Sequence, residues 1–425
     1  MKVAVIGSGG REHALALKIK ESDLLDKLYI IPGNPGTASI GENVELDIGI
    51  HDDILRWCLE KKINLVVIGP ELPLVNGLGN LLRKNNILVF GPDAEAAKIE
   101  SNKSFAKKIM KSAGVPTAKY LEFNSSMYEQ VKDFIKQKKY PCVIKANGLA
   151  AGKGVIICNN SDEAEQTIKS FFIEKIFGSS GENILIEEFL EGEETSVFAI
   201  TDGNNFVCLP PSQDHKRIGN NDTGKNTGGM GAYAPAPIAT GKLMEEIAVK
   251  IVAPTLQALK TNGRKFIGCL YAGLILTEAG PKVIEFNCRF GDPETQVVLP
   301  LLEGDLLKLL LTAASGELNK ETVQYNGGSA VCVVAASAGY PDKYEKGFEI
   351  SGLNDFQEGI IVYHAGTKIA GSKIVTNGGR VLGVTSVLKE NNLVEAKKRA
   401  YQALEKIHFE NIYYRTDIAD KAIGN

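Results

Sequence analysis

The stretch from Pro281 to Gln296 constrains the fold most, because it predicts a strand whose two faces differ in chemistry. Side chains alternate between the faces of a strand, so Glu285, Asn287 and Arg289 are expected on one face. A carboxylate and an amide two residues apart are the hard oxygen ligands that Mg²⁺ prefers when it also holds nucleotide phosphates. A solvated polar face is the alternative, and this stretch alone leaves both open. The opposite face is expected to be buried and consists of Ile284, Phe286, Cys288 and Phe290.

The neighbours of this strand predict a hairpin and a sharp stop. Leu270–Thr277 is a second strand, and the turn at 278–280 leads it back into the first. Gly291-Asp292-Pro293 ends the hairpin, with Asp292 as a candidate N-cap for a helical turn that starts at Pro293.

Bulk properties indicate a globular protein of two to four domains, because the chain has 425 residues and a hydrophobic share of 44%. The net charge of −3 favours neither nucleic acid nor an anionic membrane as a partner. No leader or membrane-length apolar run is visible, so a cytoplasmic location is expected. The cysteines form no C-x-x-C pair and are expected to be buried, reduced thiols; they are Cys58, Cys142, Cys158, Cys208, Cys269, Cys288 and Cys332.

The N-terminal hundred residues predict a doubly wound parallel sheet. Lys2–Ile6 is a short apolar strand, and the glycines of 7–10 turn it into a helix that begins near Arg11. Ligands of such sheets bind at the carboxyl ends of the strands, so a binding site is predicted at the turns after the strands. Further strands are expected at Leu28–Ile31, Leu65–Ile68 and Leu88–Phe90.

A doubly wound sheet with a glycine-rich first turn suggests a dinucleotide-dependent oxidoreductase, but the residues argue against it. The third glycine of the dinucleotide fingerprint is Glu12 here, and the second strand ends in Pro32-Gly33 instead of an acid. Free N–H groups at the helix N-terminus, together with a nearby guanidinium, suit a phosphate monoester better. The residues concerned are Gly9, Gly10 and Arg11, and structural glycines beside a surface arginine are the other interpretation.

The central region predicts a glycine-rich flap between two strands, Pro141–Lys145 and Val155–Cys158. A Walker P-loop is excluded, because only three residues separate Gly148 from Gly152 and a glycine follows Lys153. A mobile flap over nucleotide phosphates fits better, with Lys145 reaching in from the strand.

Two polar segments follow the flap. An acidic run at 187–194 comes directly after a strand at Ile184–Ile186, and it predicts either a solvated loop or a nucleoside pocket. A glycine-rich loop from Asp214 to Gly231 is too long to be inert inside a folded enzyme.

Together these motifs resemble the ATP-grasp superfamily and, over the whole chain, its glycinamide ribonucleotide synthetase (phosphoribosylamine–glycine ligase) family. The residues that carry the resemblance are Gly7–His13, Gly69–Glu71, Ile144–Val155, Ser212–Arg217, Asn226–Tyr233 and, above all, Asn287–Gln296. The resemblance implies an α/β (α+β multidomain) chain. Residues 1–101 would form a doubly wound parallel-sheet domain, 102–325 an ATP-grasp core with a mobile lid at about 120–192, and 326–425 a small, mostly antiparallel β domain.

The resemblance also implies a reaction. ATP, glycine and 5-phosphoribosylamine would give glycinamide ribonucleotide, ADP and phosphate through glycyl phosphate, in purine biosynthesis. ATP is the co-substrate, Mg²⁺ or Mn²⁺ the metal, small molecules the partners and a monomer the expected state. The alternatives are another ATP-grasp carboxylate–amine ligase or carboxylase and, more remotely, the oxidoreductase or a non-catalytic nucleotide-binding regulator.

Site residues are carried over from the resemblance position by position. The predicted nucleotide ligands are Lys103, Lys145, Gly148, Gly152, Lys153, Gly154, Glu187, the backbone of Leu190, and Glu194. The predicted substrate ligands are Gly9, Gly10, Arg11, Glu71, Asp214, Lys216, Arg217, Arg289 and Asp292. Arg289 and Lys145 are the predicted catalytic residues, and Glu285 and Asn287 the metal ligands. In some relatives a further acid completes the metal site, where this chain has Gly273.

The family usually has Asp where this chain has Asn147, which puts any charge-dependent role there in doubt. The C-terminal hundred residues predict a small antiparallel unit followed by a helix near Leu393–Ile407. The strands expected there are Ser329–Ala336, Gly359–His364, Gly371–Val375 and Arg380–Ser386. Three polar residues of this part are expected to be structural and receive no role: His364, Arg380 and Arg415.

Overall fold

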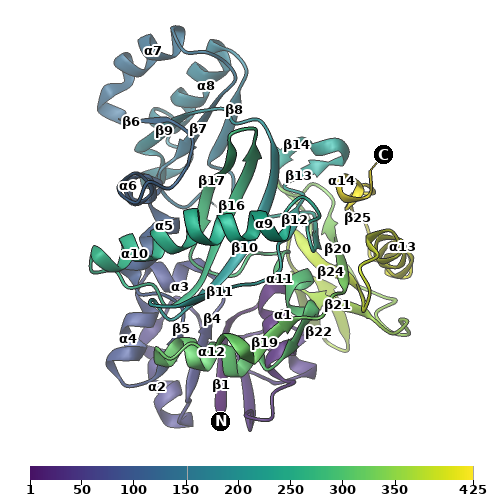
Figure 1. The fold of residues 1–425 in the computed structure, drawn as a ribbon. Helices are drawn as coiled ribbons and strands as arrows, with labels where there is room; N and C mark the ends of the chain where they lie inside the picture. The colour runs from purple at the N-terminus through teal and green to yellow at the C-terminus, as the bar shows by residue number, and fades with distance from the viewer. Residues whose placement is uncertain (151, 425) are drawn as a thin grey trace.

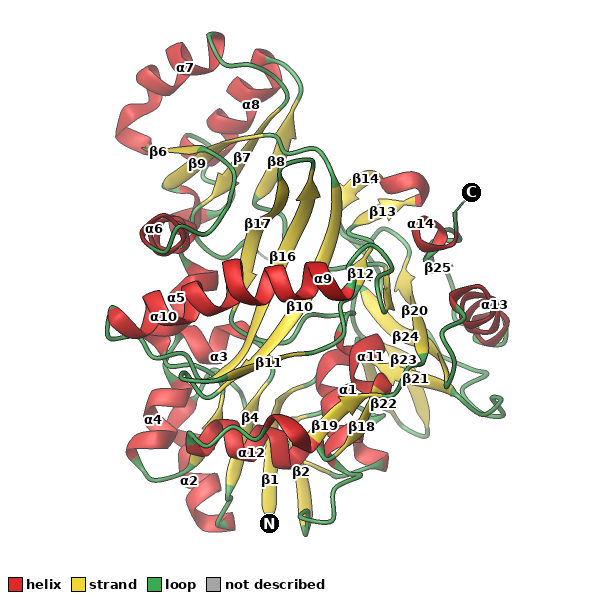
Figure 2. Cartoon of the chain, in the orientation of Figure 1, coloured by secondary structure: helices red, strands yellow, loops and turns green. Residues whose placement is uncertain are grey.

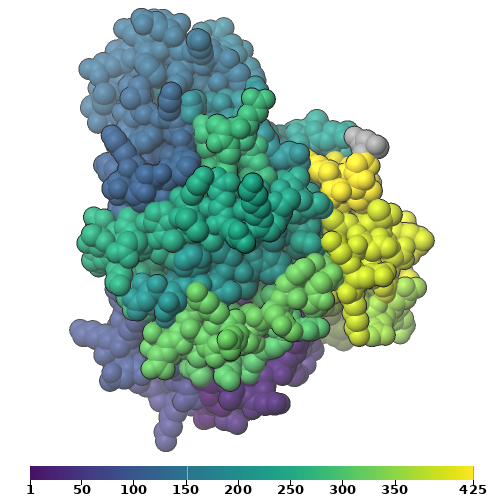
Figure 3. Space-filling view, in the orientation of Figure 1, coloured from purple at the N-terminus to yellow at the C-terminus, as the bar shows by residue number. Residues whose placement is uncertain are grey.

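A computed structural model describes residues 1–150 and 152–424. Figure 1 shows a parallel sheet at the N-terminal end, an antiparallel core sheet above it, a lid that projects beyond the core, and a C-terminal sheet at the side. In the space-filling view the lid is the most protruding part of the molecule (Figure 3). The α/β class and the four-part arrangement agree with the expectation from sequence.

The N-terminal sheet has the parallel strand order β3-β2-β1-β4-β5, as a doubly wound fold requires. Along β1, Ala4 and Ile6 belong to one buried cluster while Val3 and Val5 belong to another, because successive side chains point to opposite covered faces. The strands are β1 (Lys2–Gly7), β2 (Lys27–Pro32), β3 (Glu42–Asn43), β4 (Leu65–Ile68) and β5 (Leu88–Phe90). The helices are α1 (Gly10–Ile19), α2 (His51–Lys61), α3 (Glu71–Val75), α4 (Leu78–Lys84) and α5 (Ala94–Ser101).

The core sheet is antiparallel, in the order β11-β10-β16-β17, and the predicted hairpin is its β16–β17 pair. A long helical segment crosses one side of this sheet (Figure 2). The strands are β10 (Glu193–Thr201), β11 (Phe206–Cys208), β16 (Gly268–Thr277) and β17 (Gly280–Asn287). The helices are α9 (Gly241–Ile247), α10 (Ala253–Thr261), α11 (Thr295–Val298) and α12 (Leu306–Ser315), and β18 (Leu302–Gly304) pairs with β19 (Val323–Tyr325).

Two expectations for the 281–296 stretch are wrong. A register shift in the β16–β17 pairing falls at Ile284, so Val283 is fully buried and Ile284 only half-buried. Such a bulge exchanges the faces of the residues on either side of it. The helix begins at Thr295, and Asp292 does not cap it; its carboxylate is engaged elsewhere, as described below.

The lid is a separate four-stranded antiparallel sheet, β6-β9-β7-β8, with helices packed on one face (Figure 2). Its side chains form a hydrophobic cluster of their own, which lets the lid act as one body above the core. The strands are β6 (Tyr120–Asn124), β7 (Cys142–Ala146), β8 (Val155–Cys158) and β9 (Asn183–Glu188). The helices are α7 (Tyr128–Lys136) and α8 (Ser161–Phe172), and α6 (Lys103–Ser112) leads into the lid.

The C-terminal sheet is antiparallel as expected, but its order β12-β15-β20-β24-β21 begins with two strands from the 213–234 region. That region therefore connects the core to the C-terminal part. The strands are β12 (Gln213–Asp214), β15 (Gly231–Ala234), β20 (Ser329–Ser337), β21 (Ile360–His364), β24 (Arg380–Leu388) and β25 (Ile412–Tyr413). Two ribbons stand apart, β13 (Arg217–Gly219) with β14 (Thr223–Asn226) and β22 (Thr367–Ala370) with β23 (Lys373–Thr376); the helices are α13 (Leu393–Leu404) and α14 (Asp420–Ile423).

Within residues 1–150 and 152–424, no helix combines the length and apolarity needed to span a bilayer. The seven cysteines are free thiols, and all are buried except Cys208, which is half-buried. The expectation of reduced, mostly buried cysteines is confirmed.

Three buried histidines predict a loss of stability in mild acid. Burial lowers the pKa of His13 to about 3 and of His364 to about 4, and burial with the charges of Arg415 and Lys421 lowers that of His215 to about 4. In the unfolded chain each histidine binds a proton near pH 6.5, whereas in the folded chain it stays neutral. The free energy of unfolding is therefore not reduced by these histidines above that pH. It should fall by about 1.4 kcal/mol per pH unit for each histidine as the pH drops from about 6.5 towards about 4.

Urea denaturation between pH 7.5 and pH 5 measures this slope. His215→Leu should reduce it, because both ring nitrogens of His215 are buried without a hydrogen bond and lose nothing on replacement. The exposed His408 provides the matched control, His408→Leu. A stability that is flat over this pH range would contradict the expectation.

Candidate active site

The polar face of β17 is the centre of the candidate site. No described residue makes a hydrogen bond or ion pair with the side chain of Glu285 or Asn287, although both are half-buried. Gly273 lies directly opposite Glu285 in the β16–β17 register, so the two residues share one face of the sheet. Two uncommitted oxygen donors thus project from the end of a rigid strand.

A buried cluster of two lysines and one glutamate lies beside β17. The carboxylate of Glu187 is 3.1 Å from the Nζ of Lys107 and 3.0 Å from the Nζ of Lys145. Lys145 also donates to the carbonyl of Ile284, at the β17 bulge. Burial lowers the pKa of Lys107 to about 8, and the Glu187 carboxylate opposes that shift. Lys145 is therefore held from both sides, pointing from β7 towards the core sheet.

Lys103 and Asn147 tie helix α6 to the start of the flap. The Nζ of Lys103 donates to the carbonyl of Gly148, and the backbone N–H of Lys103 donates to the carbonyl of Asn147. The Asn147 amide oxygen accepts from the N–H of Ser104, a contact that an Asp carboxylate could equally make. Burial lowers the pKa of Lys103, while Glu285 raises it. The departure at Asn147 therefore keeps the local hydrogen bond.

The rest of the flap packs down onto other parts of the chain. A Cβ at Gly148 would come within 2.6 Å of the Ser180 hydroxyl, and one at Gly152 within 3.4 Å of the Thr227 carbonyl. The Nζ of Lys153 donates to the carbonyl of Pro341 in the C-terminal part. Gly154 accepts from the N–H of Ala146 at the flap base. Ala151 lies outside the described residues, and the described part of the flap contacts the lid, Thr227 and the C-terminal part.

The acidic segment and the glycine-rich loop meet at Lys216. Its Nζ is 2.7 Å from the Glu194 carboxylate and 4.0 Å from that of Asp214. Burial raises the pKa of Asp214 to about 7, although Lys216 lowers it, and Lys216 is the first cause of a lowered Glu194 pKa. Arg217 is not part of this group, because its guanidinium bonds the carbonyl of Gly224 in the β13–β14 ribbon. Leu190 lies in the turn between β9 and β10.

Arg289 is fixed between two carboxylates. Its Nη2 lies 2.9 Å from Glu100, and its Nε lies 3.4 Å from Glu71 at the start of α3. The other oxygen of Glu100 accepts the N–H of Cys288, so one buried acid holds both the strand end and the arginine. Burial raises the pKa of Glu71, but the charges of Arg289 and Arg11 lower it by more, so the pKa is lower than its usual value.

The expectation of free N–H groups at the start of α1 is wrong for Gly9. The N–H of Gly9 donates to the Glu12 carboxylate at 2.7 Å, and the same carboxylate pairs with Arg11. Arg11 is buried and donates to the carbonyl of Phe290, so it is no surface residue. A Cβ at Gly10 would meet the Gln296 amide at 2.6 Å. Glu12 therefore occupies the glycine turn that a dinucleotide phosphate would need.

The turn after β17 is held by a residue that sequence reasoning left without a role. Arg380 pairs with the carboxylate of Asp292 at 3.3 Å, and Gln296 donates to the same carboxylate at 2.8 Å. Burial raises the pKa of Asp292, yet Arg380 and Arg11 bring about a net lowering. The other two residues expected to be structural behave so: His364 packs on His13, and Arg415 is fully buried between Asp222 and Asp417.

Four site residues were missed: Glu100, Lys107, Glu294 and Arg380. Glu294 is 4% exposed without an ion pair to any described residue, and its place inside the 289–296 run was a usable signal. Lys107 lay in the basic helix that the sequence showed. No local pattern marks the other two, because their partners are distant in the chain.

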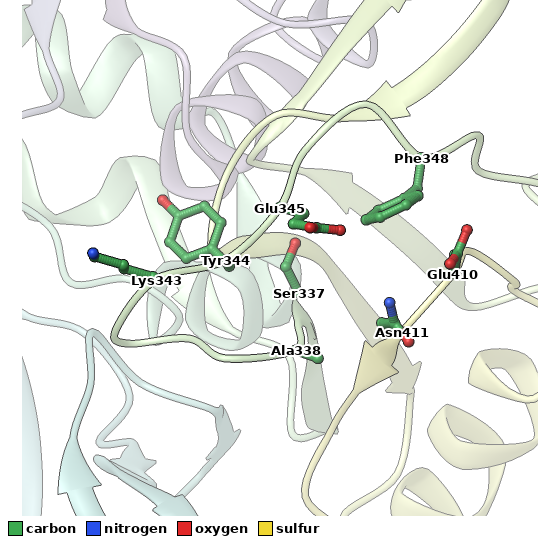
Figure 4. Close-up of a pocket in the computed structure, with 8 residues that line it drawn as sticks. All are labelled: Ser337, Ala338, Lys343, Tyr344, Glu345, Phe348, Glu410 and Asn411. Carbon is green, nitrogen blue, oxygen red and sulfur yellow. The ribbon is translucent and has the colours of Figure 1, made fainter.

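A cavity of about 370 Å³ lies away from this group, in the C-terminal part (Figure 4). None of the predicted site residues lines it. Its walls are Ser337, Ala338, Lys343, Tyr344, Glu345, Phe348, Glu410 and Asn411.

Models of three protein-family domains match the chain in order. They are described as the N domain of phosphoribosylglycinamide synthetase at residues 1–100, its ATP-grasp (A) domain at 101–295, and its C domain at 330–421.

Curated relatives match over the full length. A phosphoribosylamine–glycine ligase of Caldanaerobacter subterraneus is 45% identical over 99% of each chain. One of Rhizobium meliloti is 46% identical over 100% of this chain and 99% of its own. The trifunctional purine biosynthetic protein adenosine-3 of Gallus gallus is 44% identical, and 42% of its length is covered.

Solved structures share the fold. The phosphoribosylamine–glycine ligase of Thermotoga maritima superposes with a TM-score of 0.84 at 35% identity, covering 99% of this chain and 100% of its own. The biotin carboxylase domain of Hydrogenobacter thermophilus 2-oxoglutarate carboxylase, solved with MgADP and bicarbonate, has a TM-score of 0.74 at 19% identity, over 97% and 91%. The second similarity concerns the fold alone. On these full-length matches, the chain belongs to the phosphoribosylglycinamide synthetase family of ATP-grasp ligases.

Proposed function

We propose that the chain joins glycine to 5-phosphoribosylamine at the expense of ATP, giving glycinamide ribonucleotide, ADP and phosphate. The observation that carries the proposal is that Lys145, two uncommitted oxygen ligands and a fixed arginine lie together along β17, beside the base of the flap. The names of the full-length relatives supply the substrates. The predicted ATP-grasp division into 1–101, 102–325 and 326–425 belongs to the same proposal.

The chemistry asks the site to bring anions together. The glycine carboxylate attacks the γ-phosphorus of ATP, the bond to ADP breaks, and the ribosylamine nitrogen then displaces phosphate from glycyl phosphate. Lys103 and Lys145 neutralise the phosphates, and Arg289 steadies an anionic oxygen of the phosphate or of glycine. The closed flap keeps water from the acyl phosphate, which would otherwise hydrolyse.

A divalent cation fits the residues present. Glu285 and Asn287 offer one carboxylate and one amide oxygen, and the described residues contain no cluster of three or more acidic, cysteine or histidine ligands. Such a sparse set suits Mg²⁺, or Mn²⁺, which fills its remaining positions with water and phosphate oxygens. When bound, the cation would offset the negative charge of the nucleotide phosphates.

The predicted substrate ligands form two groups. Asp214 is the candidate for the glycine ammonium, and Lys216 for its carboxylate, since Arg217 points elsewhere. Glu71, Asp292 and the glycine turn border the side where phosphoribosylamine would enter. The Glu194 carboxylate would have to bind the nucleoside ribose while it also pairs with Lys216. The Glu187 carboxylate already pairs with two lysines, so the backbone near Leu190 is the remaining candidate for binding adenine.

Release of ADP tests the function directly. Glycine and phosphoribosylamine together should stimulate ADP release strongly, whereas either alone should not. A stimulation by bicarbonate or another amine in their place would favour a different ATP-grasp ligase or carboxylase. Tight NAD(P)H binding without any ATP turnover would instead favour the oxidoreductase.

A cytoplasmic location and a monomeric state stay predictions. Sedimentation velocity of the full chain at micromolar concentration tests the second, and a single species near 45.8 kDa is the expected result.

A further inference from the structure

Arg380 carries a guanidinium from the C-terminal sheet to two loops of the candidate site. It is the first residue of β24 and pairs with Ala336 of β20, next to a register shift at Ala335–Ala336. A bulge of this kind bends a strand and redirects the side chains beside it. The Arg380 side chain is only 22% exposed, so its charge must be met by protein groups.

One nitrogen of Arg380 binds both loops. Its Nη1 donates to the carbonyl of Gly228 at 2.7 Å and to the carbonyl of Asp292 at 2.7 Å. The same nitrogen is 3.3 Å from the Asp292 carboxylate. Hydrogen bonds from a charged donor are stronger than neutral ones and are directional. Arg380 therefore sets the distance between the backbone at 228 and the backbone at 292.

Gly228 is held through its backbone N–H as well. Its N–H donates to the hydroxyl of Tyr340, in the same C-terminal corner that accepts the flap lysine Lys153. A Cβ at Gly228 would come within 2.9 Å of the Arg380 Cζ, so glycine is what lets the guanidinium approach. Both hydrogen-bonding groups of Gly228 are thus committed to the C-terminal part.

The two loops held by Arg380 lead to different halves of the site. The Asn226–Gly229 loop is the surface on which the flap rests, since Asn226 donates to the Val155 carbonyl and Thr227 lies under Gly152. The turn at Asp292 follows Arg289 by three residues. A change in the spacing of these loops would move the flap relative to Arg289.

We propose that Arg380 is a positioning residue for the ligation, which keeps the closed flap and the Arg289 turn in register from the C-terminal domain. The proposal rests on the proposed function for its kinetic consequence, but not for its structural one. Without Arg380 the flap would seat imperfectly, and water would reach the activated carboxylate. ATP would then be consumed without ligation.

The test compares Arg380→Ala, Arg380→Lys and the control Arg399→Ala, which removes an arginine that binds a carbonyl elsewhere in the C-terminal part. For Arg380→Ala we expect ligation on the order of 100-fold slower, as for a misplacement of about 1 Å. The ratio of ADP to glycinamide ribonucleotide should rise above one, and added guanidinium should bring it back down. The rate and the ratio for Arg380→Lys should lie between those of the wild type and Arg380→Ala, because lysine keeps the positive charge but lacks the planar guanidinium group. Arg399→Ala should match the wild type.

Hydrogen exchange of the same proteins separates this inference from the proposed function. Faster exchange at 226–229 and 291–296 in Arg380→Ala supports the inference even where the wild type fails to ligate glycine. Unchanged exchange there, or an unchanged ratio of ADP to product, overturns it. If Arg380→Ala does not fold, Arg380→Lys decides by the same two readouts.

Discussion

Replacement of Glu285 with Ala is expected to slow ligation by about 10³-fold while the protein stays folded. Glu285 is half-buried, and its removal breaks no hydrogen bond or ion pair with a described residue. Under the proposed function it is the charged member of the two-residue cation site on β17. Its loss would leave Asn287 alone to hold the metal beside the nucleotide phosphates.

Steady-state rates at increasing Mg²⁺ concentration measure this effect. Glu278→Ala is the matched control, since Glu278 is exposed in the turn of the same hairpin and should leave the rate unchanged. An equal rate for Glu285→Ala and the wild type would show that the metal assignment is wrong.

Replacement of Glu187 with Ala is expected to lower the free energy of unfolding of the lid by about 3–5 kcal/mol. Glu187 is 3% exposed and lies between the ammonium groups of Lys107 and Lys145, which would remain buried without a counter-charge. Burial already lowers the pKa of Lys107 to about 8, and without the Glu187 carboxylate Lys107 would lose its proton more readily. The variant should therefore recover stability as the pH rises towards 9.

Chemical denaturation followed by a probe in the lid measures that loss. The neighbouring Glu188→Ala removes a carboxylate that is 33% exposed, and a loss of about 0–1 kcal/mol is expected for it. Equal stability losses in the two variants would contradict the role assigned to the buried cluster.

The sequence predicted most elements, because their signals are local. Leu65–Ile68, Leu88–Phe90 and Val155–Cys158 have the expected bounds, since each is an apolar run that ends at turn residues or at a helix cap. The hairpin of β16 and β17 and its polar face followed from alternation and one tight turn. The family resemblance then placed the site on that face.

What the sequence could not show depends on distant partners. The β17 bulge at Ile284 follows from pairing with β16, and a period of two cannot reveal it. Glu12 fills the glycine turn through a contact that composition does not indicate. Glu100 and Arg380 reach the site from 188 and 88 residues away along the chain, so only the fold brings them there.

Transfer of oxygen from glycine to phosphate tests whether the reaction passes through glycyl phosphate. With glycine labelled by ¹⁸O in both carboxylate oxygens, the proposed glycyl phosphate leaves one labelled oxygen in the inorganic phosphate of each turnover and one in the product amide. We expect the phosphate released with phosphoribosylamine present to carry one ¹⁸O atom. Phosphate without label, released together with ligated product, would contradict it.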